Sequence, residues 1–184
     1  MPQLLKLHPD SRCFAVRYIE VETARPRADN LVLSYIVAGT MSDILMPAVA
    51  AATRSDDLWQ HTCFEAFVRA APDAEYYEFN FAPSTQWAAY RFSGYRSGKR
   101  VADEIDPPHI EVQSGPQSCT LRASLDFSRL PALVRTVSWQ FGLSAMIEDT
   151  SGHKSYWALA HPPGKPDFHH ADCFAHEFAP AASS

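Results

Sequence analysis

The chain contains 184 residues and carries a formal net charge of −5 at pH 7. Hydrophobic residues make up 46% of it and charged residues 20%, the balance of a globular domain that can bury a core. The acidic balance, with Lys and Arg scattered along the chain, argues against a nucleic-acid partner. No apolar stretch reaches the length of a membrane span, and the first residues contain no apolar run typical of a signal peptide. We therefore expect a cytoplasmic protein with no membrane partner.

Four cysteines are widely separated and form no Cys-x-x-Cys pair. In a reducing compartment such residues behave as small hydrophobic side chains, and we predict that these four are buried. Two disulfides are the alternative if the protein is exported. The four residues are Cys13, Cys63, Cys119 and Cys173.

The first part of the chain predicts a β-hairpin. Residues 12–23 alternate in polarity, which predicts a half-buried strand with Phe14, Val16 and Tyr18 on one side. Residues 31–38 form a nearly continuous apolar run, which predicts the partner strand.

The Ala-rich segment that follows, residues 41–57, is ambiguous. Its composition is compatible with a helical turn beginning at Pro47, or with a loop that crosses a sheet edge. We predict a loop with at most one short helix.

Two aromatic-rich strands, residues 60–69 and 74–82, lie at the centre of the chain. Alternation in the first strand places one set of side chains on one face and a second set on the other: His61, Cys63, Glu65 and Phe67 against Thr62, Phe64, Ala66 and Val68. In the second strand the two sets are Tyr76, Glu78 and Asn80 against Tyr77, Phe79 and Phe81. The three aromatic residues of the last set have the volume of a core. Glu78 and Asn80 are therefore predicted to face outward beside Glu65.

The rest of the chain predicts further short strands separated by Gly and Pro turns, at 86–92, 109–113, 119–127, 136–147, 155–159 and 173–178, with one helical turn at 128–133. Short strands at roughly ten-residue spacing are typical of an all-β sandwich. We predict a single jelly-roll-like β-sandwich of mostly antiparallel strands over residues 1–178, with at most one or two short helical turns. Residues 179–184 are predicted to be a flexible tail.

Three segments carry a family resemblance: LWQHTCFEAFV, YYEFNFAPSTQWAAYRFSGYR and YWALAHPPGKPDFHHADCFAHEF. They resemble bacterial DOMON-like proteins, which are similar to the family-nine carbohydrate-binding modules of xylanases. The resemblance implies a β-sandwich whose groove binds a sugar or, in other DOMON branches, a haem.

The resemblance also implies site residues. In the sugar binders a Trp precedes a strand whose Glu reaches the sugar hydroxyls, and Trp59 and Glu65 match that pair. Glu78 and Asn80 are the nearest match to polar residues of the next strand. A second stacking aromatic residue comes from near the C-terminus in those modules, where this chain has Phe168, His169 and His170 instead of a Trp.

Flat aromatic faces and carboxylate or amide oxygens are the groups that a sugar site requires. We predict a non-catalytic site for a small polyhydroxylated ligand, with no metal and no cofactor, formed by Trp59, Glu65, Glu78, Asn80, Trp87 and His169. The alternative is that the tryptophans only pack and that the glutamates pair with Arg69 or Arg91. The sequence leaves the ligand's identity and the oligomeric state open.

Two other hypotheses remain open: a glycosidase-like or other sugar-modifying enzyme, and a carrier of haem or of a metal ion. A glycosidase would use Glu65 and Glu78, with carboxyl groups ~5 Å apart for retention or ~6.5–9.5 Å for inversion. A haem carrier would need an axial ligand over an apolar groove, for which His61, Met146 and His153 are available. A metal carrier would use the ligand-type residues of one loop, Asp167, His169, His170 and Asp172, whose spacing matches no standard zinc motif.

Overall fold

The computed structural model describes residues 2–27, 29–71, 73–130, 133 and 138–178. Twelve strands form one sheet over this part of the chain, and neighbouring strands pair antiparallel. They are β1 (Gln3–Leu7), β2 (Val16–Ala24), β3 (Asn30–Gly39), β4 (Cys63–Ala70), β5 (Tyr76–Phe81), β6 (Trp87–Phe92), β7 (Arg100–Val101), β8 (His109–Ser114), β9 (Ser118–Asp126), β10 (Trp139–Glu148), β11 (Lys154–Ala158) and β12 (His176–Phe178).

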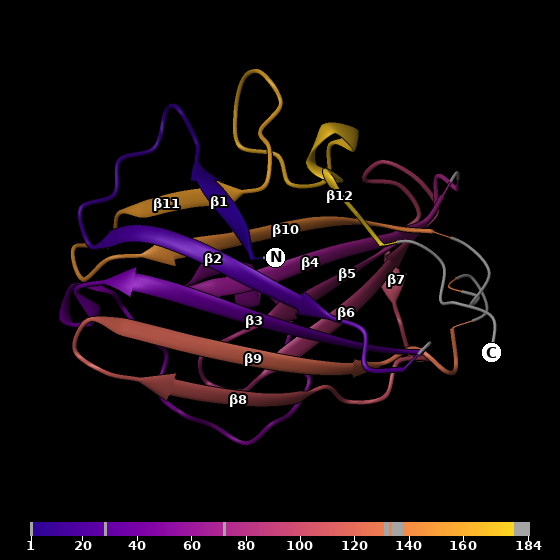
Figure 1. The fold of residues 1–184 in the computed structure, drawn as a ribbon, viewed down its shortest axis with the longest axis horizontal. Coiled ribbons are helices and arrows are strands. Elements are labelled where there is room, and N and C mark those ends of the chain that lie inside the picture. The colour runs from indigo at the N-terminus through magenta and orange to yellow at the C-terminus, as the bar shows by residue number, and fades with distance from the viewer. Residues whose placement is uncertain (1, 28, 72, 131–132, 134–137, 179–184) are drawn as a thin grey trace.

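The sheet curls into two layers that are joined through β1, which pairs with β11 on one side and with β2 on the other. One layer, the β4 layer, has the strand order β7-β6-β5-β4-β10-β11, with β12 added beside β10. The other, the β3 layer, has the order β2-β3-β9-β8 and lies in front of the first in Figure 1. The predicted all-β sandwich of antiparallel strands is confirmed.

In the part of the chain that the structure describes, helical structure is confined to short turns. Three 3-10 turns of three residues each are described: η1 (Met41–Asp43), η2 (Leu58–Gln60) and η4 (Ala171–Cys173). Among the described residues no helix is long and apolar enough to cross a membrane. The part of the predicted helical turn that falls at 131–132, and the predicted tail at 179–184, lie outside the described residues.

The main core lies between the two layers and follows the period of two along each strand. On β4 and β5 the inward side chains are those predicted from alternation: Phe64, Ala66 and Val68, and Tyr77, Phe79 and Phe81. On β10 they are Trp139, Phe141, Leu143, Ala145 and Ile147. They meet Leu33 and Tyr35 of β3 and Leu121 and Ala123 of β9. The Tyr35 hydroxyl donates to the Glu65 carbonyl oxygen at 2.7 Å, so this buried polar group is satisfied across the core.

The prediction for the first strand is partly wrong. Phe14 is 94% exposed and Tyr18 is 42% exposed, whereas Val16, Ile19 and Val21 are buried. The pairing of β2 with β3 shifts in register between Val16 and Tyr18. A bulge of this kind adds one residue to a strand and reverses the faces of the residues beyond it.

The sequence analysis also missed β1. Its consecutive leucines hide the alternation, because Leu4 is exposed while Leu5 packs in the core. The segment 41–57 is a loop after η1, as predicted, and no helix begins at Pro47. Backbone hydrogen bonds between Ser55 and Trp87 and between Trp87 and Thr53 hold this loop against the start of β6. All four cysteines are free thiols; three are buried and Cys13 is half-buried.

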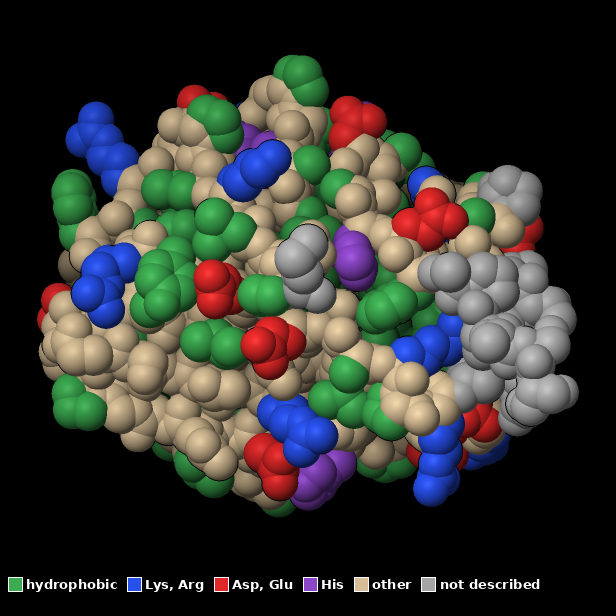
Figure 2. Space-filling view, in the orientation of Figure 1, with side chains coloured by type: hydrophobic (Ala, Val, Ile, Leu, Met, Phe, Trp, Pro, Cys, Tyr) green, Lys and Arg blue, Asp and Glu red, His purple; other side chains and the backbone are tan. Residues whose placement is uncertain are grey.

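The outer face of the β3 layer is shown in Figure 2, where acidic and basic side chains are interspersed over a largely tan surface. The outer face of the β4 layer is different, because it carries a second, smaller cluster of buried aromatic side chains, which includes Phe67, Tyr76 and Phe92.

Candidate functional site

The outer face of the β4 layer carries the two central glutamates. Glu65 and Phe67 of β4 and Glu78 and Asn80 of β5 point away from the main core, as alternation predicted. In the register Glu65 pairs with Asn80, and Phe67 pairs with Glu78. The two glutamates are therefore diagonal neighbours, a position in which residues lie about 7–8 Å apart. The shorter spacing of a retaining glycosidase would need the two glutamates to face each other directly, and they do not.

A cavity of about 430 Å³ opens over these glutamates. Its lining combines aromatic or apolar side chains with carboxylates and cations. The residues are Trp59, Glu65, Glu78, Phe92, Arg96, Lys99, Met146, Lys154, Tyr156, Pro166, Phe168 and His169. Three of the predicted ligand-binding residues outside the loop, Trp59, Glu65 and Glu78, thus share one hollow.

The floor is formed by the two carboxyl groups, each in a residue that is 5% exposed. Burial raises the pKa of Glu65 well above its usual value, and the neighbouring Glu78 raises it further; Ser144 and Arg96 offset part of this rise. Burial also raises the pKa of Glu78, while Asn80, Lys99 and Arg96 act in the opposite direction. Burial and mutual repulsion thus both disfavour simultaneous ionisation of the two carboxyl groups.

The alternative in which arginines neutralise these acids is not realised. Arg69 donates from Nε to Gln140 Oε1 at 2.8 Å, and Arg91 forms ion pairs with Glu75 and Glu104. Among the described residues, no Arg or Lys lies within ion-pair distance of either floor carboxylate. The glutamates therefore retain acceptor oxygens for a ligand.

Asn80 orients the floor and does not line the cavity. Its Nδ2 donates to Glu78 Oε1 at 2.7 Å, and the Cys63 thiol lies 3.8 Å from its Oδ1. Both Asn80 and Cys63 are buried. A buried amide with partners on both ends is fixed in orientation, so Glu78 is held in one position.

The two predicted tryptophans lie in different places. Trp59, on η2, is 49% exposed at the cavity and offers a flat aromatic face. Trp87 is 7% exposed and packs in the main core between the layers. On β6 the outward residues are Ala88, Tyr90 and Phe92, so the parity of the strand directs Trp87 away from the cavity. The structure does not bring Trp87 to this site.

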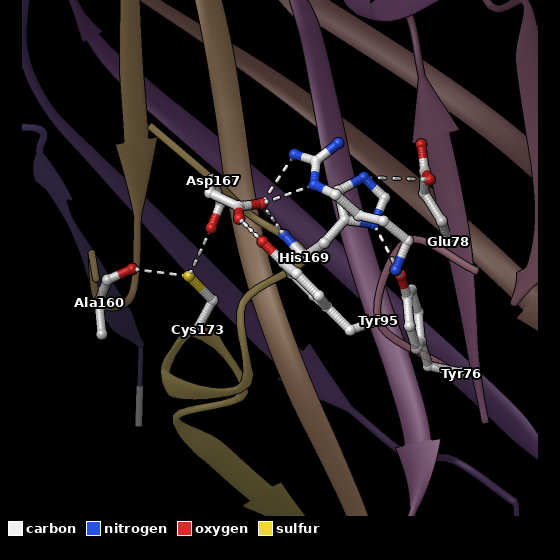
Figure 3. A network of polar contacts seen from close by, with 8 residues as sticks. Tyr76, Glu78, Tyr95, Ala160, Asp167, His169 and Cys173 are labelled. Carbon is white, nitrogen blue, oxygen red and sulfur yellow. Dashed lines mark hydrogen bonds and ion pairs between the residues drawn. The ribbon is translucent and has the colours of Figure 1, made fainter. Parts of the chain in front are cut away.

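His169 comes from the loop between β11 and η4 and forms one wall. Its Nδ1 lies 2.8 Å from the Tyr76 hydroxyl, and its Nε2 lies 3.7 Å from Glu78 Oε2 (Figure 3). Burial, together with the charge of Arg96, lowers the pKa of His169 to about 4, so the ring is neutral at pH 7. Because the Tyr76 oxygen accepts from the Arg96 backbone N–H, its own proton is available to Nδ1, and we infer that Nε2 carries the ring proton toward Glu78.

Asp167 fastens the same loop to the sheet (Figure 3). Its Oδ1 accepts from Arg96 at 2.7 Å and from the His169 backbone N–H at 3.1 Å, and its Oδ2 accepts from the Tyr95 hydroxyl. The Cys173 thiol adds two contacts of 3.2 Å to the carbonyl oxygens of Ala160 and Asp167. The loop that carries the cavity wall is thereby held in place from both ends.

Gly142 of β10 lets the end of this loop approach the sheet. A Cβ at this position would lie 3.2 Å from the Cys173 carbonyl oxygen and 3.4 Å from the Phe67 Cβ. Few real Cβ contacts are that short. A side chain at this position would push η4 and the loop outward.

The sequence analysis missed several lining residues. Phe92, Met146 and Tyr156 face outward by strand parity, so the period of two contained a signal for them. Arg96 and Lys99 lie between β6 and β7, where no period applies. Arg96 has a positive φ of 50°, an uncommon conformation for a side chain of its size.

The candidate metal and haem ligands have other partners. Among the described residues, no three His, Cys, Asp or Glu side chains are placed to hold a metal ion. Asp167 is engaged by Arg96, His61 Nδ1 lies 2.7 Å from Glu148 Oε2, and His153 Nε2 lies 3.0 Å from the Arg12 carbonyl oxygen. Met146 is the one candidate axial ligand that lines the cavity among the described residues.

No protein-family model and no curated protein matches the chain. Solved structures with a similar fold include a proposed carbohydrate-binding protein from Bacteroides uniformis, with a TM-score of 0.67 and 14% identity over 94% of this chain and 82% of that one. A family-nine carbohydrate-binding module from Caldicellulosiruptor kristjanssonii in complex with cellotriose has a TM-score of 0.54 and 11% identity, over 89% and 74% of the two chains. A family-nine carbohydrate-binding module from the same organism in complex with glucose has a TM-score of 0.54 and 12% identity, over 95% of this chain and 81% of that one.

These similarities define the class of fold: a β-sandwich of the kind found in family-nine carbohydrate-binding modules. The predicted resemblance to these modules is thus confirmed as far as the fold. The likeness to DOMON proteins stays a prediction.

Proposed function

We propose that this protein binds a small carbohydrate in the cavity on the outer face of the β4 layer and does not transform it. The observation that carries the proposal is the convergence of Trp59, Glu65 and Glu78 on one hollow of about 430 Å³. Such a volume lies within the range of small-molecule sites.

The chemistry of the lining suits a sugar. A pyranose presents a face of C–H groups that packs on a flat aromatic ring, and Trp59 offers such a ring at the cavity. Its hydroxyl groups need acceptors and donors around the edge. Glu78, oriented by Asn80, accepts, whereas a protonated Glu65 both donates and accepts.

The structural neighbours add support from the fold. Two of them are family-nine carbohydrate-binding modules in complex with cellotriose and with glucose. Their complexes provide a precedent for a sandwich of this kind that binds a sugar. The residues that would do so here are those of this chain's own cavity.

Calorimetric titration with a panel that includes glucose and cellotriose tests the proposal. The wild-type protein is expected to bind at least one member, and Trp59→Ala to weaken that binding by about two- to tenfold, since loss of a stacking face removes ~0.5–1.5 kcal/mol. Phe14→Ala, which removes another exposed aromatic residue far from the cavity lining, serves as the control and should bind like the wild type.

Absence of binding across the panel, or unchanged affinity in Trp59→Ala, would contradict the proposal. Incubation with aryl glycosides separates binding from catalysis. A binder releases no product, and release that disappears in Glu65→Gln would establish the glycosidase alternative instead.

A further inference from the structure

Three cations line the cavity in addition to the two acids: Arg96, Lys99 and Lys154. Arg96 is already paired, because its guanidinium donates twice to Asp167, at 3.2 and 2.7 Å. Its guanidinium therefore already has a counter-ion, and it holds the loop to the sheet.

Lys99 lies at the β6 side of the cavity. Its ammonium nitrogen is 3.8 Å from the centre of the Tyr90 ring, a cation–π contact. Its charge also lowers the pKa of Glu78, which means that it stands near that carboxylate. Lys99 therefore balances the negative charge on the floor.

Lys154 lies at the opposite side, because the strand order is β6-β5-β4-β10-β11 and Lys154 begins β11. Lys154 pairs with Glu148 of β10 across the two strands, and the Oε2 of Glu148 lies 2.7 Å from His61 Nδ1. Among the described residues, Lys154 has no carboxylate partner. It is a half-buried cation that faces the cavity without a counter-ion.

The floor does not cancel this charge. Glu65 lies between the two lysines on β4, and burial raises the pKa of its carboxyl group, which favours the neutral form over the charged one. An anionic group placed near Lys154 therefore meets a cation of the cavity lining that has no carboxylate within ion-pair distance among the described residues. In a half-buried position, an ion pair with an ammonium is stronger than one at the open surface.

We propose that the ligand is a sugar with an anionic substituent, a carboxylate or a phosphate ester, which pairs with Lys154 while the sugar hydroxyls reach Glu65 and Glu78. This inference rests on the proposed function, because it assumes that the cavity holds a sugar. It makes Lys154 the residue that selects among sugars.

Titration with matched ligands tests the inference: glucose, galactose and mannose against glucuronate, galacturonate and the corresponding 6-phosphates. At least one acidic sugar is expected to bind about tenfold or more tightly than its neutral parent, and the preference should shrink as salt is added. The uronates and the phosphates distinguish the two anionic groups.

Variants assign the preference to one residue. Lys154→Met should abolish it, and Lys154→Arg should keep it, because the charge is retained. Lys6→Met, which removes an exposed lysine that does not line the cavity, should change nothing. Equal affinity for neutral and acidic sugars, or an intact preference in Lys154→Met, would overturn the inference and leave sugar binding standing. Absence of binding by every sugar would overturn both.

Discussion

The two faces of the β4 layer differ in what they contribute, although the same strands form both. The inner face of β4 and β5 is a continuous set of aromatic and aliphatic side chains that are buried against the β3 layer. The outer face of β4 and β5 carries Glu65, Glu78 and Asn80 beside a smaller aromatic cluster. A period of two thus lets eight residues of β4 support the fold on one side and a polar cavity on the other.

The two faces also differ in how burial affects stability. Each large apolar side chain on the inner face contributes roughly 1.5–3 kcal/mol by leaving water. Each carboxyl on the outer face is buried without an ion pair to Arg or Lys in the part of the chain that the structure describes. Such burial disfavours folding. The outer face is the region where function is expected to be gained at the expense of stability.

The largest effect is expected on the inner face. Phe79 is fully buried and stacks with Phe127 at 5.6 Å and with Phe81 at 6.4 Å between ring centres. Phe79→Ala should lower the free energy of unfolding by about 3–5 kcal/mol, because it leaves a cavity in the core. Urea denaturation measures this loss. Trp59→Ala on the exposed rim should change it by less than about 0.5 kcal/mol, and similar losses in both variants would erase the distinction between the faces.

The pH dependence of stability should identify His169 on the outer face. Burial holds the pKa of the folded ring at about 4, against an ordinary value of 6.5. Between these two pH values the unfolded state binds a proton at His169 and the folded state does not. The free energy of unfolding therefore falls as the pH drops from about 6.5 to about 4, by up to about 3 kcal/mol.

Denaturation curves at several pH values check this prediction. His169→Gln should remove that part of the slope, and His109→Gln, at an exposed position on β8, should leave it unchanged. An identical slope in His169→Gln would show that another group causes the acid sensitivity.

The loop contact made by Asp167 should have a smaller effect. Burial alone would raise the pKa of Asp167, but the hydrogen bonds from Tyr95 and Arg96 outweigh it and lower the pKa. Asp167→Asn should cost about 1–2 kcal/mol and speed amide hydrogen exchange in the loop before η4. Asp172→Asn, on a more exposed carboxylate of the same segment, is the matched control. Unchanged exchange in Asp167→Asn would mean that Cys173 and the β12 pairing hold the loop without it.

The smallest effect on stability is expected for Glu65→Gln, because glutamine has nearly the same size and shape as glutamate. The raised pKa of Glu65 means that the unfolded state releases its proton at a lower pH than the folded state does. Stability therefore falls as the pH rises above the ordinary carboxyl value of 4.5. Glu65→Gln should match the wild type below this pH and be more stable at pH 8, whereas the exposed Glu111→Gln should follow the wild type throughout. A variant less stable than the wild type at pH 8 would indicate that the carboxylate is ionised and paired.

Alternation predicted what regular strands dictate. The inward set of β10 and the outward position of Glu65 and Glu78 follow from a period of two, and both are present in the structure. The same rule failed at Tyr18, because the register shift in β2 cannot be recognised from hydrophobicity alone, and at Phe14, because that residue precedes the strand.

The rest of the cavity depends on tertiary structure. Trp87 was assigned to the site by residue type, and strand parity places it in the core instead. Arg96, Lys99 and His169 reach the cavity from loops, whose paths are set by contacts such as Arg96 with Asp167 and Tyr76 with His169. These contacts join residues 71 and 93 positions apart in the chain, and no local pattern encodes them.

A crystal structure of the protein with the tightest-binding sugar from the titrations tests the central claim most directly. The account predicts a sugar ring stacked on Trp59, with hydroxyl oxygens about 3 Å from the carboxyl groups of Glu65 and Glu78. A sugar bound elsewhere, or one in the cavity that touches neither carboxyl group, would contradict it.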